Sequence, residues 1–290
     1  MIFHDGEIFM IGHGYESLLD SGKFEVYKCY EKRKDDENVM RALKLVMHGG
    51  SKDGIEEAKL SLRRELESLM RTQSSQHIVD LVGIIQYEYW SGIVLEYLPA
   101  GNLCDCLRKY KPSFWLRLRI INDVAQGIHF LHQKISTLND ISHNDLKPQN
   151  VLLDKDFRAK ICDFEGSDII SRTSGLESFK TWRCITSVAK NYTAPEVQTA
   201  CYNSIGPEAV KIKREKAMDI FSFAMIIYFT LTRKHPLDEI DSCVSRNQLF
   251  MKGYRPKMPG KYDFSSTPEA NDALGKLIEQ MKHCWRQDPR

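Results

Sequence analysis

The run from His143 to Asn150, HNDLKPQN, gathers an acid, a lysine and an amide within its last six positions. A short apolar strand is predicted next, over 151–153, and an Asp-Phe pair follows at Asp163. Phosphoryl transfer needs such a set, because one carboxylate faces the accepting hydroxyl while other oxygen ligands hold magnesium. The residue types and their spacing therefore indicate a compact loop system that handles phosphate.

These residues resemble the catalytic loop and metal-binding motif of eukaryotic protein kinases, with seven of eight positions of H-R-D-L-K-P-x-N kept. The resemblance can be traced over residues 7–290. It implies an α+β, bilobal protein kinase fold, with a small antiparallel β-sheet N-lobe that holds one main helix and a larger, mostly helical C-lobe. The implied boundaries are 1–95 for the N-lobe, 96–101 for the hinge and 102–290 for the C-lobe, which ends before the family's last helix.

The resemblance also implies roles within the loop. Asp145 is expected to be the catalytic base or orienter of the accepting hydroxyl, and Lys147 to stabilise charge on the transferred group. Asn150 and Asp163 are expected to hold Mg²⁺ or Mn²⁺, since hard cations prefer oxygen ligands. A single loop aspartate is usually a turn residue, so these roles depend on the whole ordered run.

A lysine and a glutamate upstream complete the expected catalytic set. Lys44 ends the run Arg-Ala-Leu-Lys, which resembles the V-A-I-K strand whose lysine neutralises the α- and β-phosphates of ATP. Its partner is expected to be Glu65 on the following helix. Glu67 is the nearby competitor, but helical spacing places it on a different face from the apolar residues.

The glycine-rich loop can be read in two registers. Gly12 and Gly14 match G-x-G-x-x-G except that Ser17 replaces the last glycine, while Gly22 begins a second, shorter match. We favour Gly12 and Gly14 over the phosphates with Val26 on the next strand; a plain hairpin with no ligand is the alternative. The other residues expected to bind ATP line the adenine pocket or the hinge: Ala42, Leu95, Glu96, Leu98 and Leu152.

Two residues depart from the family pattern. Asn144 stands where an arginine usually contacts a phosphate on the activation segment, and an amide cannot make that charge-assisted pair. We therefore expect that phosphorylation of this segment is not the main switch. Glu165 replaces the glycine after Asp163-Phe164 and adds a negative charge. Three effects of Glu165 are open: a restricted inactive flip, an outer-shell metal contact, or impaired metal binding.

Two further acids are expected to support the larger lobe. Glu196 lies in Ala-Pro-Glu, which resembles the A-P-E motif, and by analogy its glutamate pairs with an arginine late in the domain. The sequence ends at Arg290 before that arginine is expected, so either the chain is truncated or another cation serves Glu196. Asp219 begins the run DIFSFA, which resembles the family's D-x-W-S-F-G, and that resemblance implies that it holds the catalytic-loop backbone.

The elements that must position these residues follow from the hydrophobic pattern. Strands are predicted over residues 7–11, 24–30, 39–46, 78–84 and 92–96, and helices over 56–71, 113–132, 218–231 and 273–285. Ser113 is expected to cap the second of these helices. The most apolar stretch, 221–231, is shorter than the roughly 20 residues that span a bilayer, so a buried core helix is expected.

Composition narrows the class of protein. The chain has 290 residues, with 41 basic against 39 acidic side chains, which gives no case for a nucleic-acid partner. Eight cysteines are scattered without a CxxC pair, and no signal peptide is evident. These observations predict a chain with free thiols in a reducing compartment, cytoplasmic or nuclear.

We therefore expect a protein kinase that transfers the γ-phosphoryl of ATP to Ser/Thr hydroxyls of protein substrates. Lys147-Pro148 resembles Ser/Thr kinases rather than tyrosine kinases, although dual specificity stays open. The alternative is a pseudokinase, a nucleotide-binding signalling scaffold, which Asn144, Glu165 and Ser17 favour. Small-molecule phosphotransfer is a third reading, disfavoured by the A-P-E match. The sequence makes no prediction of oligomeric state.

Overall fold

The computed structural model describes residues 2–3, 8–10, 17–20, 24–32, 37–46, 52–86, 91–133, 140–170, 179–182, 191–203, 210–213, 216–238, 240, 248–258 and 267–286. The chain divides into two compact units. Unit 1 is Met1–Pro99 with Cys162–Glu165, and unit 2 is Ala100–Ile161 with Gly166–Arg290.

Unit 1 is built on a seven-stranded sheet. Its strands are β1 (Ile2–Phe3), β2 (Ile8–Met10), β3 (Ser17–Asp20), β4 (Phe24–Lys32), β5 (Asn38–Val46), β6 (Leu81–Gln86) and β7 (Ser91–Glu96). The order is β1-β6-β7-β5-β4-β2, with β3 also pairing with β4. All pairs are antiparallel except β1 with β6. A small antiparallel sheet was expected from the resemblance, and the structure confirms it.

The predicted start of the strand β6 is wrong. Residues 78–84 were expected to form a strand, but β6 begins at Leu81 and continues to Gln86. Ile78 and Val79 are buried, at 1% and 2% exposure, yet they precede the strand. Their apolar character therefore reflects burial of the segment between the helix and the strand rather than an extended strand.

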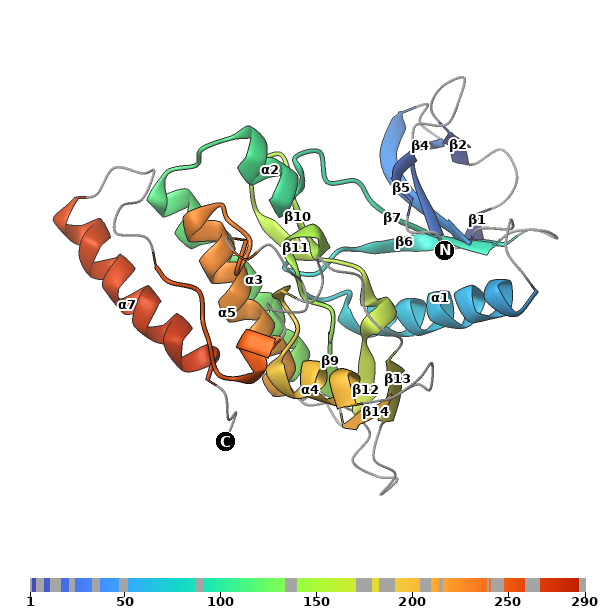
Figure 1. Cartoon of the computed structure of the whole chain (residues 1–290). Coiled ribbons are helices and arrows are strands. Elements are labelled where there is room, and N and C mark those ends of the chain that lie inside the picture. Colours follow the sequence, from blue (N-terminus) through green and yellow to red (C-terminus); the bar gives the residue numbers. More distant parts are fainter. Residues whose placement is uncertain are drawn as a thin grey trace. The chain divides into compact units, whose positions relative to one another are not determined.

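The helix α1 (Lys52–Thr72) packs on this sheet (Figure 1). Its buried face follows helical spacing through Ala58, Leu62, Glu65 and Leu69. Asp53 in the first turn and Arg71 in the last turn complement the helix dipole. Glu65 is thus a carboxylate on the buried face of this helix, and it contacts Lys44 of the sheet.

Unit 2 is mostly helical. Its helices are α2 (Leu103–Lys109), α3 (Phe114–His132), α4 (Pro195–Asn203), α5 (Lys216–Thr232) and α7 (Pro268–Cys284). In Figure 1, α3 and α7 both lie against α5. Ser113 caps α3 as expected, because its side chain accepts a hydrogen bond from the backbone N–H of Leu116. The helical lobe predicted from the sequence is confirmed.

Unit 2 also contains short strands that flank its loops. They are β8 (Gly101–Asn102), β9 (Asp140–Ser142), β10 (Val151–Leu153), β11 (Ala159–Ile161), β12 (Asp168–Ile170), β13 (Phe179–Trp182) and β14 (Val210–Lys213). They pair as β11-β10-β8, β12-β9 and β13-β14. Two 3₁₀ turns, η1 (Pro148–Asn150) and η2 (Phe164–Gly166), follow the catalytic-loop acid and Asp163.

Among the described residues, every helix is too short or too polar to cross a lipid bilayer.

Candidate functional site

Lys44 lies at the centre of a charged cluster in unit 1. It pairs with Val26 of β4 and Ile93 of β7 in the sheet register, and its side chain is only 7% exposed. Its Nζ donates to Glu65 Oε2 at 2.7 Å, to Asp163 Oδ1 at 3.0 Å and to Glu165 Oε1 at 2.7 Å. The expected Lys44–Glu65 contact is therefore present, and the sequence had not predicted the contact with Glu165.

The cluster holds one cation against three carboxylates. The carboxylate oxygens of Glu65, Asp163 and Glu165 lie within 4.8 Å of one another. Burial, aided by Asp163 and Glu165 and opposed by Lys44, raises the pKa of Glu65 to about 7. Burial disfavours the charged form of Lys44, but the three carboxylates outweigh it and hold its pKa well above the usual range. The pKa of Glu65 is therefore raised mainly by burial, whereas that of Lys44 is raised by the carboxylates around it.

The two ends of the cluster differ in their access to water. The Glu65 side chain is 1% exposed, whereas those of Asp163 and Glu165 are 27% and 26% exposed. The ring of Phe24 lies 4.6 Å from the Lys44 ammonium and adds a cation–π contact. Lys44 is therefore anchored from the buried side by Glu65 and reached from the open side by the two other acids.

The catalytic loop lies in unit 2 and is organised around Asp145. Lys147 Nζ donates to Asp145 Oδ2 at 2.6 Å. Asn150 Nδ2 donates to the backbone oxygen of Asp145 at 2.8 Å and to its Oδ2 at 3.2 Å. The structure thus brings three of the predicted residues together. Because the Asn150 amide nitrogen is committed to Asp145, its carbonyl oxygen is the atom left for a metal ion.

Asp219 holds the backbone of this loop, as predicted. Its side chain is fully buried in the first turn of α5. Oδ2 accepts the N–H of His143 at 2.9 Å, and Oδ1 accepts the N–H of Asn144 at 2.8 Å. His132 Nε2 lies 2.8 Å from the same Oδ2. The sequence did not indicate His132; it lies at the end of α3, where position alone gives no sign of this contact.

Asn144 ties the loop to the residues after Phe164. Its backbone φ is +63°, a left-handed conformation that asparagine tolerates better than most side chains. Its Nδ2 donates to the backbone oxygens of Ser142 and Gly166, both at 3.2 Å. The residue that replaces the expected arginine therefore makes neutral contacts to the loop and to the start of the activation segment.

Gly166 lies close to the loop that holds Asp145, and the sequence reasoning did not single it out. A Cβ at this position would lie 3.0 Å from the His143 backbone oxygen and 3.2 Å from the Asp145 Cβ. A glycine is thus present one residue after the position where the family pattern has one, and it packs closely against His143 and Asp145. The signal was available, since Asp163-Phe164-Glu165 is followed directly by glycine.

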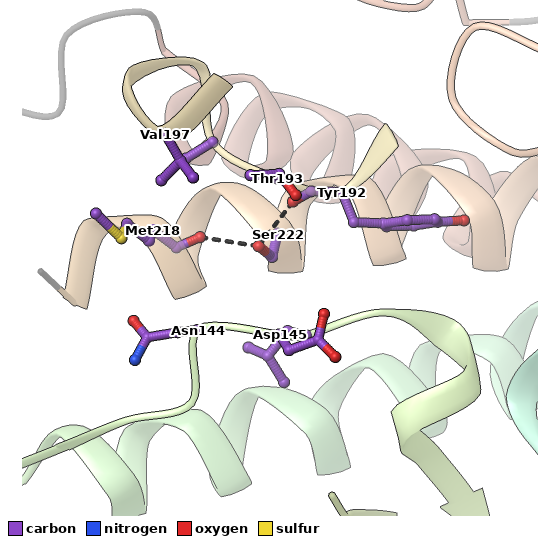
Figure 2. A pocket seen from close by; sticks show the side chains of 9 residues that line it. Asn144, Asp145, Tyr192, Thr193, Val197, Met218 and Ser222 are labelled. Atoms are coloured by element: carbon purple, nitrogen blue, oxygen red, sulfur yellow. Dashed lines mark hydrogen bonds between the residues drawn. The ribbon is translucent and has the colours of Figure 1, made fainter. Parts of the chain in front are cut away.

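A small pocket adjoins Asp145 (Figure 2). It lies between the catalytic loop, the residues entering α4, and the α5 residues Met218 and Ser222. Ser222 Oγ lies 2.8 Å from the Tyr192 backbone oxygen and 2.9 Å from that of Met218, and its single O–H can donate to either. The cavity volume is about 10 Å³, room for about a single water molecule. Within the described part of the chain, Asn144 Oδ1 is buried without a hydrogen-bond partner, and a water here would satisfy it.

The predicted ATP-binding residues are distributed over both units. Val26, Ala42 and Leu95 lie in one sheet, where Val26 pairs with Lys44 and Ala42 with Leu95. Leu98 is buried after β7, and Leu152 is the central residue of β10 in unit 2. Gly12 and Gly14 lie outside the described residues.

The side chain of Glu96 is engaged in structure rather than left for a ligand. Its Oε1 accepts from the backbone N–H of Asp80 at 2.7 Å, and its own N–H donates to the Asp80 oxygen at 3.0 Å. A role in ligand binding would therefore fall to backbone groups of the hinge rather than to this side chain.

Arg255 is the cation that the structure offers to Glu196. Burial lowers the pKa of the Arg255 guanidinium, and the negative charge of Glu196 opposes that shift. The guanidinium donates to the backbone oxygens of Trp285 and Tyr254 at 2.6 and 2.7 Å, and lies 5.1 Å from the centre of the Phe221 ring. Arg255 therefore interacts electrostatically with Glu196.

Comparisons with known proteins agree with this geometry. The family model described as protein kinase domain matches residues 15–290. Receptor-interacting serine/threonine-protein kinase 2 of Bos taurus is 30% identical, over 78% of this chain and 39% of that protein. Serine/threonine-protein kinase STY17 of Arabidopsis thaliana is 27% identical, over 76% of this chain and 33% of that protein. Receptor-interacting serine/threonine-protein kinase 1 of Homo sapiens is 28% identical, over 93% of this chain and 37% of that protein.

The chain spans 39%, 33% and 37% of the lengths of these three relatives, so the likeness concerns one part of each. Within this chain, however, the family match covers both the cluster around Lys44 and the loop around Asp145. The sheet-bearing and helical units, the two charged constellations and this match together show that the chain belongs to the protein kinase family.

Proposed function

We propose that this chain is an active protein kinase that transfers the γ-phosphoryl of ATP to serine or threonine hydroxyls of protein substrates. One observation carries the proposal: the Asp145 carboxylate accepts hydrogen bonds from Lys147 Nζ, at 2.6 Å, and from the amide of Asn150. This is the arrangement that a base or orienter needs beside a cation that offsets phosphoryl charge. The intact Lys44–Glu65 pair supports it independently.

Magnesium, or manganese, is the proposed metal, and the donor set fits it. Asp163 offers a carboxylate, and Asn150 offers the amide oxygen left by its bonds to Asp145. Hard divalent cations prefer such oxygen ligands. When bound, the metal neutralises phosphate charge; Lys44 orients the phosphates, and Asp145 orients the accepting hydroxyl.

Serine and threonine are the proposed acceptors because of Lys147-Pro148 and because the three relatives are named as serine/threonine kinases. The test is incubation with γ-labelled ATP, Mg²⁺ and a generic protein substrate, followed by hydrolysis and identification of the labelled amino acid. Label on serine and threonine is expected. Label on tyrosine alone would contradict the assignment.

The second candidate is a nucleotide-binding scaffold without phosphotransfer. One observation favours it: Glu165 contacts Lys44, the residue proposed to meet the phosphates. Under this alternative ATP raises the melting temperature but no phosphate is transferred.

A further inference from the structure

All three donors of Lys44 are used. An ammonium group has three N–H bonds, and the Nζ of Lys44 donates to three carboxylates at 2.7, 2.7 and 3.0 Å. A phosphate oxygen can therefore reach this ammonium only if one carboxylate releases it. Two of the acids, Glu65 and Asp163, occupy positions of the family pattern, whereas Glu165 stands where that pattern has glycine.

Burial indicates which acid is released. Removing Lys44 from Glu65 would leave a carboxylate with 1% exposure unpaired in the interior, which is strongly unfavourable. Asp163 and Glu165 are about a quarter exposed, so water can solvate them when they separate from Lys44. Of these two, Asp163 is the proposed metal ligand and keeps a cation near it when nucleotide is bound. Glu165 is thus the acid whose separation from Lys44 we expect on binding.

We propose that Glu165 is an affinity determinant for nucleotide: it occupies one donor of Lys44 in the free protein and must leave it when a nucleoside triphosphate binds. This inference rests on the proposed function, since it takes Lys44 as the phosphate-binding residue. Glu165 opposes binding in two ways, by holding the donor and by placing a negative charge where the phosphates arrive. A divalent cation offsets part of that charge, so the effect is greatest without it.

The test compares ATP dissociation constants of wild type, Glu165→Gln and Glu165→Ala, measured by calorimetry in EDTA and in Mg²⁺. Gln keeps a hydrogen-bond acceptor but loses the charge, and Ala loses both. Glu67→Gln is the matched control, because Glu67 lies on the exposed face of α1 and its replacement changes the net charge equally. Thermal unfolding without nucleotide checks that each variant is folded.

In EDTA, both Glu165 variants are expected to bind ATP more tightly than wild type, on the order of tenfold for Ala and less for Gln. The gain in Mg²⁺ is expected to be smaller, and Glu67→Gln is expected to match wild type. Equal constants for all folded proteins would overturn the inference while leaving nucleotide binding intact. Weaker binding of the Glu165 variants in Mg²⁺ would also overturn it, since Glu165 would then be a metal ligand.

Failure of the proposed function has a different signature. If wild type, both Glu165 variants and the control bind no ATP in either buffer, the phosphate-binding role of Lys44 is wrong and the inference falls with it. Binding by the Glu165 variants alone would support the inference, because the contact would then block the site completely in wild type.

Discussion

Asp219 Oδ1 accepts the backbone N–H of Asn144 at 2.8 Å, so one buried carboxylate fixes the residue directly before the proposed catalytic acid. The same side chain accepts the N–H of His143 through its other oxygen. The left-handed backbone conformation of Asn144 is thereby stabilised by a residue 75 positions away in the sequence. The geometry of Asp145 depends on this support.

Replacing Asp219 by Asn is expected to lower the free energy of unfolding by about 3 kcal/mol, because an amide has only one acceptor oxygen for two buried N–H donors. Urea unfolding followed by fluorescence measures this. Asp272→Asn, at an exposed position of α7, is the control and should stay within about 0.5 kcal/mol of wild type. Equal losses in the two variants would show that Asp219 does not hold the loop.

Replacing Gly166 by Ala is expected to reduce phosphotransfer, since the new Cβ meets the His143 oxygen at 3.0 Å and displaces the catalytic loop. The expected loss of stability is about 1–3 kcal/mol. Gly275→Ala is the matched control: no atom lies within 4 Å of its Cβ, and alanine in a helix should stabilise by about 0.5–1 kcal/mol. Unchanged activity in Gly166→Ala would contradict the close approach.

The cluster around Lys44 makes stability depend on pH. The pKa of Glu65 is raised by burial from 4.5 to about 7, so between these values the folded chain binds more protons than the unfolded chain. Its contribution to the free energy of unfolding therefore falls as the pH rises from about 4.5 to 7. Denaturant unfolding at several pH values measures the slope.

Glu165→Gln isolates this contribution, because it removes one of the carboxylates that raise the pKa of Glu65. Its stability should fall less steeply with pH than that of wild type, while Glu67→Gln should follow wild type. Parallel curves for wild type and Glu165→Gln would show that the two acids do not interact.

Because Asn144 replaces the expected arginine, we expect the rate of phosphotransfer not to depend on phosphorylation of the activation segment. Its amide donates to the Gly166 oxygen, a neutral contact that needs no phosphate. Treatment with a phosphatase is expected to leave the rate of phosphotransfer unchanged within about twofold. A large loss of rate after dephosphorylation, regained on rephosphorylation, would refute this expectation.

The sequence predicted the parts of the site that lie close together in the chain. Asp145, Lys147 and Asn150 share one short run, and their local spacing already places them in one loop. Lys44 and Glu65 were paired through the resemblance to the family pattern, and helical spacing served only to disfavour Glu67. Asp163 needed the resemblance, since no local rule joins residues 119 positions apart.

The rest depended on side-chain directions and tertiary packing that no spacing encodes. Nothing in the sequence indicates that Glu165 turns to Lys44 rather than to solvent. Arg255 is one of 41 basic residues, and only packing brings its charge near that of Glu196. The start of β6 was predicted three residues too early for a related reason. Ile78 and Val79 are as buried as strand residues, although they precede the strand.

The most direct test of phosphotransfer is the initial rate of label transfer from γ-labelled ATP, in Mg²⁺ and at saturating nucleotide, by wild type, Asp145→Asn and Asp272→Asn. The account predicts transfer by wild type and Asp272→Asn at equal rates, and a rate at least about 100-fold lower for Asp145→Asn with unchanged ATP affinity. Equal rates for wild type and Asp145→Asn, or no transfer by any of the three, would contradict it.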